Sequence, residues 1–583
     1  MSVRMKTLSL IASGTLAVMP FVGLYMAIGA RYDDQTLVTV VSEEPARRGS
    51  ILDRNGEVIA YDEELFEIVL LPSLFYENKE VNSAIERLFE AGGKKLKADT
   101  SLPVDKNGKI TGNDEETELL KTTLGFDSAD GDKLLKRLYG IFGIDKKSKY
   151  AYKTAAVRYH AHISGAQSYV LCKAEDDELL RAARALSESM PFIRGRSVFE
   201  RKYASVAAPH IILSTQEQLS ERLSGEDGSR KEVYRVLSQS AQLDESAGKE
   251  VKNGEDITLT IDSGYQLKIQ SILGSAVKDG KCKGGAICVA DCRSGELLAC
   301  ASAPDFDISR YNKDYDELYA DPSLPLFDRA LSGLYRPGSA MKTITAFAAL
   351  DKGVIDKDTS IWCGKWYPLG DTTFSCLYYH GFENVETALR DSCNVFFYKC
   401  SQMIGQNDLS SYQYGFGLGA SVPCGLENES GRVVTPESVN ELGIVWSEGL
   451  LLQSAIGQSE NAVTPIQMVQ WAAMLANKGE LIPVSVIKGK DYAPTKVYKN
   501  DAAFDEIKAG MIMAANNIWG EDSLASLPEK AAIKTGTPET GSGFDSTVIG
   551  FYPADDPEIA FSVVLEDSEQ SKSLIKGIIE AYL

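Results

Sequence analysis

Three short motifs in the C-terminal half of the chain bring together side chains that could carry out acyl transfer. One is Lys534-Thr535-Gly536-Thr537, which contains the chain's only Lys-Thr-Gly and follows the apolar residues 531–533. This placement predicts a strand edge on which a lysine and two threonine hydroxyls could hold the carboxylate of a peptide. Gly536 lacks a Cβ, so another backbone could approach the strand closely at that point.

A second motif is Ser339-Ala340-Met341-Lys342. Ser-x-x-Lys alone is weak evidence, because it recurs at Ser246, Ser275, Ser485 and Ser573. The context favours Ser339: a turn sequence stands at 336–338, and an alanine-rich apolar helix is predicted from 341 to 350. Ser339 would begin that helix, and the i,i+3 spacing would place Lys342 on the same face. A helix N-terminus also favours negative charge developing on the serine.

The third motif is Ser392-Cys393-Asn394. Ser-x-Asn recurs at Ser438 and Ser459, but only the triplet at 392 precedes an apolar run, residues 395–398, that would pack it into a core. Each motif is common by chance. Their occurrence in this order within one dense apolar region is not, and it predicts a single site.

In this order the motifs resemble the signature set of penicillin-binding proteins and class A β-lactamases. Further segments are similar to those of class B penicillin-binding proteins: residues 48–56, 334–342, 456–468 and 550–554. The resemblance is close over residues 31–60 and 257–583 and loose over 61–250. The family's Gly-Leu-Glu and Tyr pattern before the catalytic domain is missing, and Ser214 to Arg222 stands in its place.

This resemblance implies a peptidoglycan D,D-transpeptidase that cross-links stem peptides through a Ser339 acyl-enzyme and is acylated by β-lactams. Lys342 would be the general base, which requires a neutral amine and a lowered pKa. Ser392 would relay a proton to the leaving D-alanine, and Asn394 would bind the substrate amide. Lys534 and the threonines of its motif would recognise the terminal carboxylate. The backbone N–H groups of Ser339 and Thr537 would form the oxyanion hole.

Other functions stay open at this point. A β-lactam sensor or anchored β-lactamase fits the large N-terminal region poorly. A catalytically weak scaffold that activates a membrane glycan polymerase conflicts with the intact motif residues. A Ser-His-Asp site is disfavoured because the chain has 4 histidines, His160, His162, His210 and His380, and no Gly-x-Ser-x-Gly. A P-loop is excluded because Ser339 occupies the lysine position.

Residues 8–30 carry no charge, and Arg4 and Lys6 precede them. About 20 apolar residues span a bilayer, so this segment predicts a transmembrane helix. The basic flank predicts a cytoplasmic N-terminus and an extracytoplasmic catalytic domain, in a single-pass protein of the cell membrane. A cleaved signal peptide is the alternative, but its apolar core would be only about 7–15 residues long.

Composition and cysteine content limit the other possibilities. The net charge of −21 disfavours binding to nucleic acid. The 10 cysteines include no CxxC pair, so we predict no metal and no cofactor. Cys363 and Cys376 could close a loop as a disulfide, although spacing alone leaves the connectivity open.

The 583 residues should fold as several domains. We expect a cytoplasmic tip and anchor at 1–31, an N-terminal pedestal of the dimerisation type at 32–250 with a polar insertion near 75–155, and a transpeptidase domain at 251–583. The polar stretch 216–253 predicts a linker. The resemblance also implies that anchor and pedestal contact a SEDS-type (shape, elongation, division and sporulation) glycan polymerase.

The C-terminal region alternates between strand and helix patterns. Apolar runs at 287–290 and 297–303 flank one turn, and runs at 548–552 and 559–565 flank another. Helices are predicted at 265–277 and 573–582. This order indicates an α+β fold in which helices cover an antiparallel sheet, and the resemblance implies the fold of serine β-lactamases.

Overall fold

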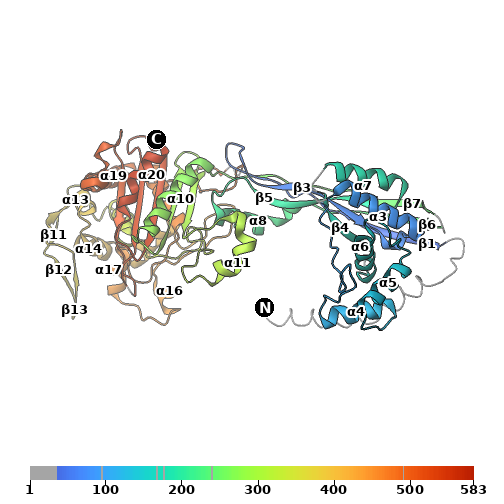
Figure 1. The fold of residues 1–583 in the computed structure, drawn as a ribbon. Coiled ribbons are helices and arrows are strands. Elements are labelled where there is room, and N and C mark those ends of the chain that lie inside the picture. The colour runs from blue at the N-terminus through green and yellow to red at the C-terminus, as the bar shows by residue number, and fades with distance from the viewer. Residues whose placement is uncertain are drawn as a thin grey trace. The chain divides into compact units, whose positions relative to one another are not determined.

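A computed structural model describes residues 36–93, 96–165, 168–174, 177–237, 240–489, 492–541 and 543–583. Contacts divide the chain into two units (Figure 1): the first holds residues up to 48, 62–201 and 224–254, and the second holds 49–61, 202–223 and 255–583. The predicted anchor at 8–30 lies outside the described residues. Within the described ranges, no helix is both long enough and apolar enough to cross a membrane.

One sheet of the first unit is antiparallel, with β6 (Gly228–Val236) between β1 (Thr36–Glu44) and β7 (Ala241–Lys249). Strands β6 and β7 occupy the segment where we predicted a linker, so that prediction is wrong. Almost every residue of β7 is exposed. Its polar composition therefore reflects an edge strand with solvent on both faces, and such a strand lacks the apolar alternation that identifies half-buried strands.

The remaining elements of the first unit include the predicted polar insertion, which is helical as expected. Its helices are α3 (Asn78–Gly92), α4 (Asp114–Leu124), α5 (Gly131–Ile141) and α6 (Ala151–Ile163). A small core of leucines, among them Leu120, Leu134 and Leu138, lies between α4, α5 and α6. Helix α7 (Asp177–Ser189) packs on α3. Strand β4 (Tyr169–Ala174) pairs with β3 (Val58–Leu70), and β5 (Ile193–Tyr203) pairs with β3 as well.

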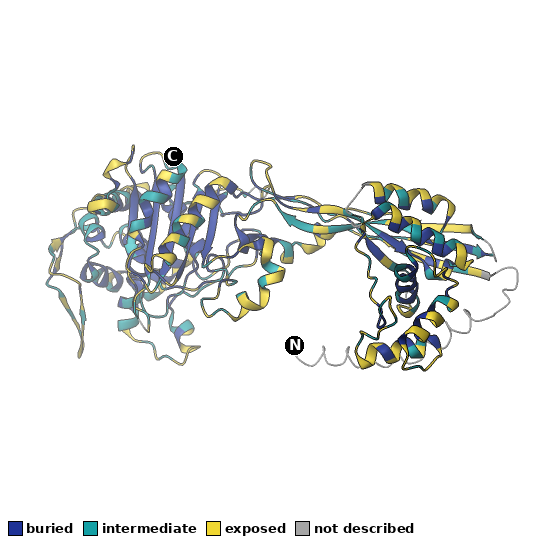
Figure 2. Ribbon diagram, viewed as in Figure 1, coloured by how far each residue is buried: buried dark blue, intermediate teal, exposed yellow. Residues whose placement is uncertain are grey.

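The second unit is built on a five-stranded antiparallel sheet with the order β10-β9-β19-β18-β17. The strands are β9 (Gly284–Asp291), β10 (Leu297–Ala303), β17 (Ala532–Gly536), β18 (Ser546–Tyr552) and β19 (Ile559–Glu566). Figure 2 shows these strands as the buried centre of the unit. The prediction of an antiparallel sheet covered by helices is confirmed. Strand β17 lies at one edge of the sheet.

Successive side chains along each strand point to opposite faces of the sheet, and each face belongs to a different hydrophobic core. Ile287 and Val289 belong to the core that contains α10 (Ser263–Lys278) and α20 (Lys572–Tyr582). Cys288 and Ala290 belong to the core that contains α18 (Pro465–Ala476). Because successive residues of a strand point to opposite faces, a strand buried on both sides reads as a continuous apolar run.

Smaller elements surround the site described below. A 3-10 turn, η3 (Gly338–Met341), leads into α12 (Lys342–Asp351), as the sequence predicts. Helices α13 (Val385–Arg390) and α14 (Asn394–Ile404) follow four short strands, β11 (Ile361–Cys363), β12 (Trp366–Leu369), β13 (Thr372–Ser375) and β14 (Gly381–Glu383). A hairpin turn at Asn55-Gly56 joins β2 (Ile51–Leu52) to β3.

Further helices complete the unit. They are α8 (Pro209–Gln218), α9 (Ser220–Ser224), α11 (Tyr311–Ala320), α15 (Gln406–Gly415), α16 (Pro436–Asn440), α17 (Glu448–Ala455) and α19 (Asp501–Asn516). Short strands β8 (Ile257–Thr258), β15 (Glu480–Leu481) and β16 (Thr495–Lys496) lie between them along the chain.

Candidate active site

The turn that carries Ser339 is fixed from two sides. Gly338 has a φ of +55° and donates its N–H to the carbonyl of Gly457 at 2.9 Å. Thr547 Oγ1 on β18 donates to the carbonyl of Pro337 at 2.8 Å. A left-handed φ suits glycine, because a Cβ would strain it. Ser339 is half-buried, so its position is held by the core while the residue keeps access to solvent.

Lys342 begins α12 one turn later and is completely buried. Its Nζ donates to the Ser392 carbonyl at 2.7 Å, to Ser392 Oγ at 3.1 Å and to Asn394 Oδ1 at 2.6 Å. These three acceptors match the three donors of an ammonium group. Burial lowers the pKa of Lys342 to about 8, and the negative charge of the nearby Cys376 thiolate opposes this shift.

No hydrogen bond joins Ser339 Oγ to Lys342 Nζ in the described part of the chain, since the three oxygens of Ser392 and Asn394 take the ammonium protons. A neutral amine keeps only two N–H groups and gains a lone pair. Loss of one proton therefore releases one of these bonds and frees an acceptor. The lysine becomes able to take a proton from a serine one helical turn away.

Ser392 has a φ of +56°, an uncommon conformation for a residue with a side chain. Such a conformation costs about 1–3 kcal/mol and persists only where the surroundings enforce it. Its Oγ accepts from Lys342 Nζ and also from Lys534 Nζ, the latter at 3.2 Å. The strained backbone therefore places one hydroxyl between two buried lysines.

Lys534 lies on the edge strand β17 and is 1% exposed. Its Nζ also donates to the Thr535 carbonyl at 2.8 Å. Burial lowers the pKa of Lys534 well below its usual value, and the charge of Lys342 lowers it further. Thr535 is half-buried and Thr537 is exposed, so both can meet a ligand while the lysine stays inside.

Gly536 allows β17 to lie directly against the turn of Ser339. A Cβ at this position would stand 2.4 Å from Thr547 Oγ1, 2.7 Å from the Pro337 carbonyl and 3.0 Å from Ser339 N. No side chain fits in that space. The close approach brings the N–H of Ser339 next to the end of β17, where two backbone donors could meet one oxyanion.

The structure thus brings all eight predicted site residues into one place: Ser339, Lys342, Ser392, Asn394, Lys534, Thr535, Gly536 and Thr537. They come from the start of α12, the start of α14 and the edge of the sheet. The arrangement provides a half-exposed hydroxyl, a buried amine of lowered pKa, a shared hydroxyl relay and an unpaired strand edge.

A cluster of metal-binding side chains lies behind the Ser392–Asn394 segment. Cys363, Cys376, His380 and Cys393 each offer one ligand atom, and these four atoms lie within 4.8 Å of one another. His380 Nδ1 is 3.5 Å from the Sγ atoms of both Cys363 and Cys376. Three thiolates and one imidazole are a suitable tetrahedral set for Zn²⁺. Four protein ligands would leave no open position, so a bound ion would stabilise the structure without taking part in the reaction.

The surroundings of one of these thiols, Cys376, favour the thiolate form, whereas the hydrogen bond to Cys376 raises the pKa of the Cys393 thiol. The Cys393 thiol and the backbone N–H groups of Val395 and Asn394 donate hydrogen bonds to Cys376, and they lower the pKa of its thiol. The thiolate is the form that binds metals. All ten cysteines are free thiols, so the disulfide that we considered between Cys363 and Cys376 is not formed.

Sequence reasoning missed this cluster because it searched for closely spaced pairs. The four ligands are spread over residues 363–393 and meet only after β11 and β14 pair with each other. The available signal was a lone histidine among three cysteines immediately before and within the Ser-x-Asn motif. That signal is weak without the pairing of the strands.

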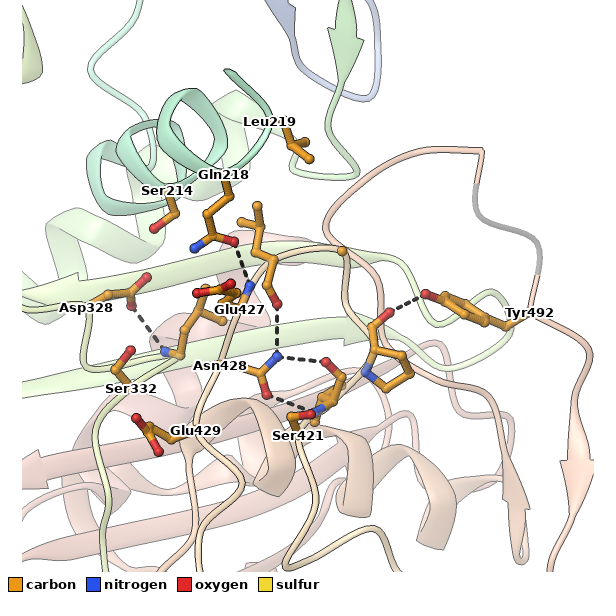
Figure 3. Close-up of a pocket in the computed structure, with 15 residues that line it drawn as sticks. Ser214, Gln218, Leu219, Asp328, Ser332, Ser421, Glu427, Asn428, Glu429 and Tyr492 are labelled. Carbon is orange, nitrogen blue, oxygen red and sulfur yellow. Dashed lines mark hydrogen bonds between the residues drawn. The ribbon is translucent and has the colours of Figure 1, made fainter. Parts of the chain in front are cut away.

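A separate cavity of about 780 Å³ lies elsewhere in the second unit (Figure 3). Its lining includes the end of α8 and the loop 421–429, which are joined where Glu427 N donates to Gln218 Oε1 at 2.6 Å. Asp328, Glu427 and Glu429 line it, and none of the described lining residues is a lysine, arginine or histidine. None of the predicted site residues lines this cavity, so it does not belong to the candidate active site.

Comparison with known proteins is consistent with this geometry. The family described as "Penicillin binding protein transpeptidase domain" matches residues 285–580, and "Penicillin-binding Protein dimerisation domain" matches residues 43–217. Peptidoglycan D,D-transpeptidase MrdA of Escherichia coli (strain K12) is 26% identical over 576 residues, covering 89% of this chain and 83% of that protein. Peptidoglycan D,D-transpeptidase PbpA of Mycolicibacterium smegmatis is 28% identical over 353 residues, covering 55% and 70%.

Solved structures share the fold. Penicillin-binding protein PBP2 from Helicobacter pylori, in a complex with MreC, superposes with a TM-score of 0.66 at 20% identity, covering 94% of this chain and 99% of that one. Pseudomonas aeruginosa PBP2 gives a TM-score of 0.57 at 22% identity, covering 93% and 97%. With the transpeptidase match spanning more than half of the sequence, this chain belongs to the penicillin-binding protein transpeptidase family.

Proposed function

We propose that this chain is a peptidoglycan D,D-transpeptidase with Ser339 as its nucleophile. One observation carries the proposal: two buried lysines, Lys342 and Lys534, both donate a hydrogen bond to Ser392 Oγ, beside the turn of Ser339. Both lysines have a lowered pKa. Burying two cations together is costly, and a stable fold would ordinarily avoid it. Clusters of strongly shifted pKa values are typical of catalytic sites.

Acylation proceeds with Lys342 as the base. The neutral amine takes the proton from Ser339 Oγ, which attacks the carbonyl carbon of the penultimate D-alanine of a stem peptide. The oxyanion of the tetrahedral intermediate is bound by the N–H groups of Ser339 and Thr537, and each such donor is worth about 10²–10³ in kcat. The C–N bond then breaks, and Ser392 passes a proton to the amine of the departing D-alanine.

Deacylation uses an amine from a second stem peptide. This amine attacks the Ser339 ester, loses a proton to the same base and forms the cross-linking amide, while Ser339 Oγ regains its proton. A β-lactam enters by the same attack but has no leaving group that departs from the site. It therefore stops the reaction at the acyl-enzyme.

The edge of β17 binds the donor peptide as an additional strand. Its other side is paired with β18, so its free backbone groups are available to an extended peptide. Lys534 and the hydroxyls of Thr535 and Thr537 bind the terminal carboxylate. Asn394 holds the substrate amide, and its Oδ1 is kept in place by Lys342.

The proposal also places the catalytic unit outside the cytoplasm, anchored by residues 8–30, in the membrane beside a SEDS-type glycan polymerase. The uncharged segment with its basic flank supports this placement. A structure entitled "Structural coordination of polymerization and crosslinking by a peptidoglycan synthase complex" has a TM-score of 0.66 to this chain. Exchange of residues 8–30 for an unrelated anchor should weaken co-purification with the polymerase. Unchanged co-purification and activation after both the anchor and the segment around Arg48 have been altered would contradict the partnership.

Labelling with a fluorescent penicillin tests the reaction itself. Wild-type protein should carry a covalent label, and Ser339→Ala should carry none. Ser573→Ala is the matched control, because Ser573 begins another Ser-x-x-Lys next to a helix start and should be dispensable. Folded wild-type protein that takes no label would favour a non-catalytic scaffold. A label that is rapidly hydrolysed would favour a β-lactamase.

A further inference from the structure

Three aromatic rings form an exposed cluster beside the cysteine cluster. Trp362 on β11 and Phe382 on β14 are cross-strand partners, and their ring centroids are 4.8 Å apart. The ring of Tyr379 is 5.4 Å from that of Trp362. These side chains are 44%, 72% and 62% exposed in the order Trp362, Phe382, Tyr379. We call these three residues the aromatic platform.

The surrounding segment is also apolar and exposed. Trp366 is 61% exposed, Leu377 66% and Tyr378 70%, although all three are large side chains. A concentration of such residues on a surface is uncommon unless something binds there. Figure 1 shows β11, β12 and β13 at the margin of the second unit, away from the central sheet.

The platform is connected to the catalytic groups through the cysteine cluster. Cys363 follows Trp362, and His380 follows Tyr379, so two platform residues are neighbours of the cysteine cluster. The cluster reaches the active site through Cys376, whose Sγ accepts the N–H of Asn394 at 3.1 Å. Asn394 also donates its Nδ2 to the Ser375 carbonyl at 3.3 Å. The platform and the active site are therefore connected through the cysteine cluster, which adjoins Asn394 on its buried side.

The charge of the segment limits what can bind. Between residues 361 and 382 the charged side chains are Lys365 and Asp371, which cancel, and Lys365 lies over the Trp366 ring at 5.4 Å. A lipid surface is typically contacted by several Lys or Arg residues next to the aromatic ones, and this segment has a single one. The absence of net charge suits a neutral ligand, although the whole chain carries −21.

The area of the platform limits the ligand further. An aromatic side chain has roughly 150–250 Å² of surface, so the three rings expose on the order of 300–400 Å². A standard protein interface needs about 800 Å² from each partner. The platform offers about half of that area, which matches one or two sugar rings. Neither Trp362 Nε1 nor Tyr379 OH donates to another residue in the ranges the structure describes, so both are available to sugar hydroxyls.

We propose that the aromatic platform binds the glycan backbone of peptidoglycan and aligns the stem peptide that hangs from it. The C–H faces of sugar rings lie against the electron-rich faces of the aromatic rings, and the polar edges of Trp362 and Tyr379 bind hydroxyl or acetamido groups. This inference rests on the proposed transpeptidase function and adds a glycan subsite to it. Selection of polymerised glycan over free peptide follows from that subsite.

Three substrates separate the platform from the catalytic groups. They are a fluorescent penicillin, a soluble stem peptide that ends in D-alanyl-D-alanine, and uncross-linked glycan strands that carry the same peptide. Tyr379→Ala and Phe382→Ala should each reduce cross-linking of the strands about tenfold, through a higher KM. Both variants should react with penicillin and with the free peptide at wild-type rates. Trp519→Ala is the matched control, because Trp519 is 79% exposed in the same unit but is not part of the platform.

A second measurement tests binding alone. Glycan strands freed of their peptides should bind the wild-type protein and the Trp519→Ala control, and should bind Tyr379→Ala and Phe382→Ala more weakly. Unchanged cross-linking of strands by the platform variants overturns the proposal. Equal losses with the free peptide overturn it as well, since they indicate a structural role. Loss of a protein partner without any loss of glycan binding assigns the surface to that partner. Failure of wild-type labelling by penicillin would instead refute the proposed function.

Discussion

The Ser392–Asn394 segment lies between two regions that differ in their exposure to water. Ser392 and Asn394 direct their oxygens to the buried Lys342, where burial lowers a pKa. Cys393, between them, belongs to the cysteine cluster that carries an exposed aromatic segment. One side depends on the exclusion of water, and the other side presents rings to water. These three consecutive residues therefore lie between the buried lysine, which would set the reaction rate, and the aromatic platform, which would select the substrate.

The strongest test of this division is Lys342→Ala. Removal of a general base typically costs about 10²–10⁴ in rate. We expect penicillin acylation to fall about 10³-fold, while glycan binding by the aromatic platform stays unchanged. Acylation can be followed by stopped-flow labelling, with Lys352→Ala, at the other end of α12, as the control. A parallel loss of glycan binding would show that the aromatic platform is not independent of the catalytic lysine.

The variation of the acylation rate with pH should reflect the ionisation of Lys342 alone. The pKa of Lys342 is lowered to about 8, and only the neutral amine accepts a proton. Below that pH the rate should rise about tenfold for each pH unit, and above it the rate should level off. Glycan binding by uncharged rings should vary little across the same range. A rate profile that is flat between pH 6 and 8, roughly the range below the pKa, would contradict the role of Lys342 as base.

Metal removal should mainly affect the cysteine cluster, and it should have a smaller effect on the rate of acylation than the loss of Lys342 or a change of pH. We expect purified protein to contain one Zn²⁺, measured by atomic emission. Chelation, Cys363→Ser or His380→Ala should lower Tm by roughly 3 °C, which corresponds to about 2 kcal/mol in a domain of this size. Acylation should fall only several-fold, through a less well-held Asn394. Cys282→Ser removes a buried cysteine outside the cluster and should leave the zinc content unchanged.

Metal-free protein in which Cys363 and Cys376 form a disulfide would contradict this prediction. Titration of free thiols with and without a chelator distinguishes the two states.

Features that depend on residues near one another in the sequence could be predicted, and features that depend on distant contacts could not. The strands at 287–303 and 548–565 could be predicted because apolar runs flank recognisable turns. The three motifs could be grouped because their order is specific. The positive φ of Ser392 could not be foreseen, since the strain is imposed by distant packing. The cysteine cluster and the polar strand β7 were missed for the same reason: both depend on which strands pair, and pairing is not a local property.

The anchoring of the Ser339 turn has a consequence for biosynthesis. The chain is made from its N-terminus, but the turn is held by Gly457 and by Thr547, which lies 210 positions after its partner Pro337. Until the last part of the chain has emerged and β18 has entered the sheet, the serine exists without the geometry that activates it. We therefore expect an unfinished or truncated chain to be inert toward penicillin and peptide alike. The onset of reactivity therefore marks the completion of folding.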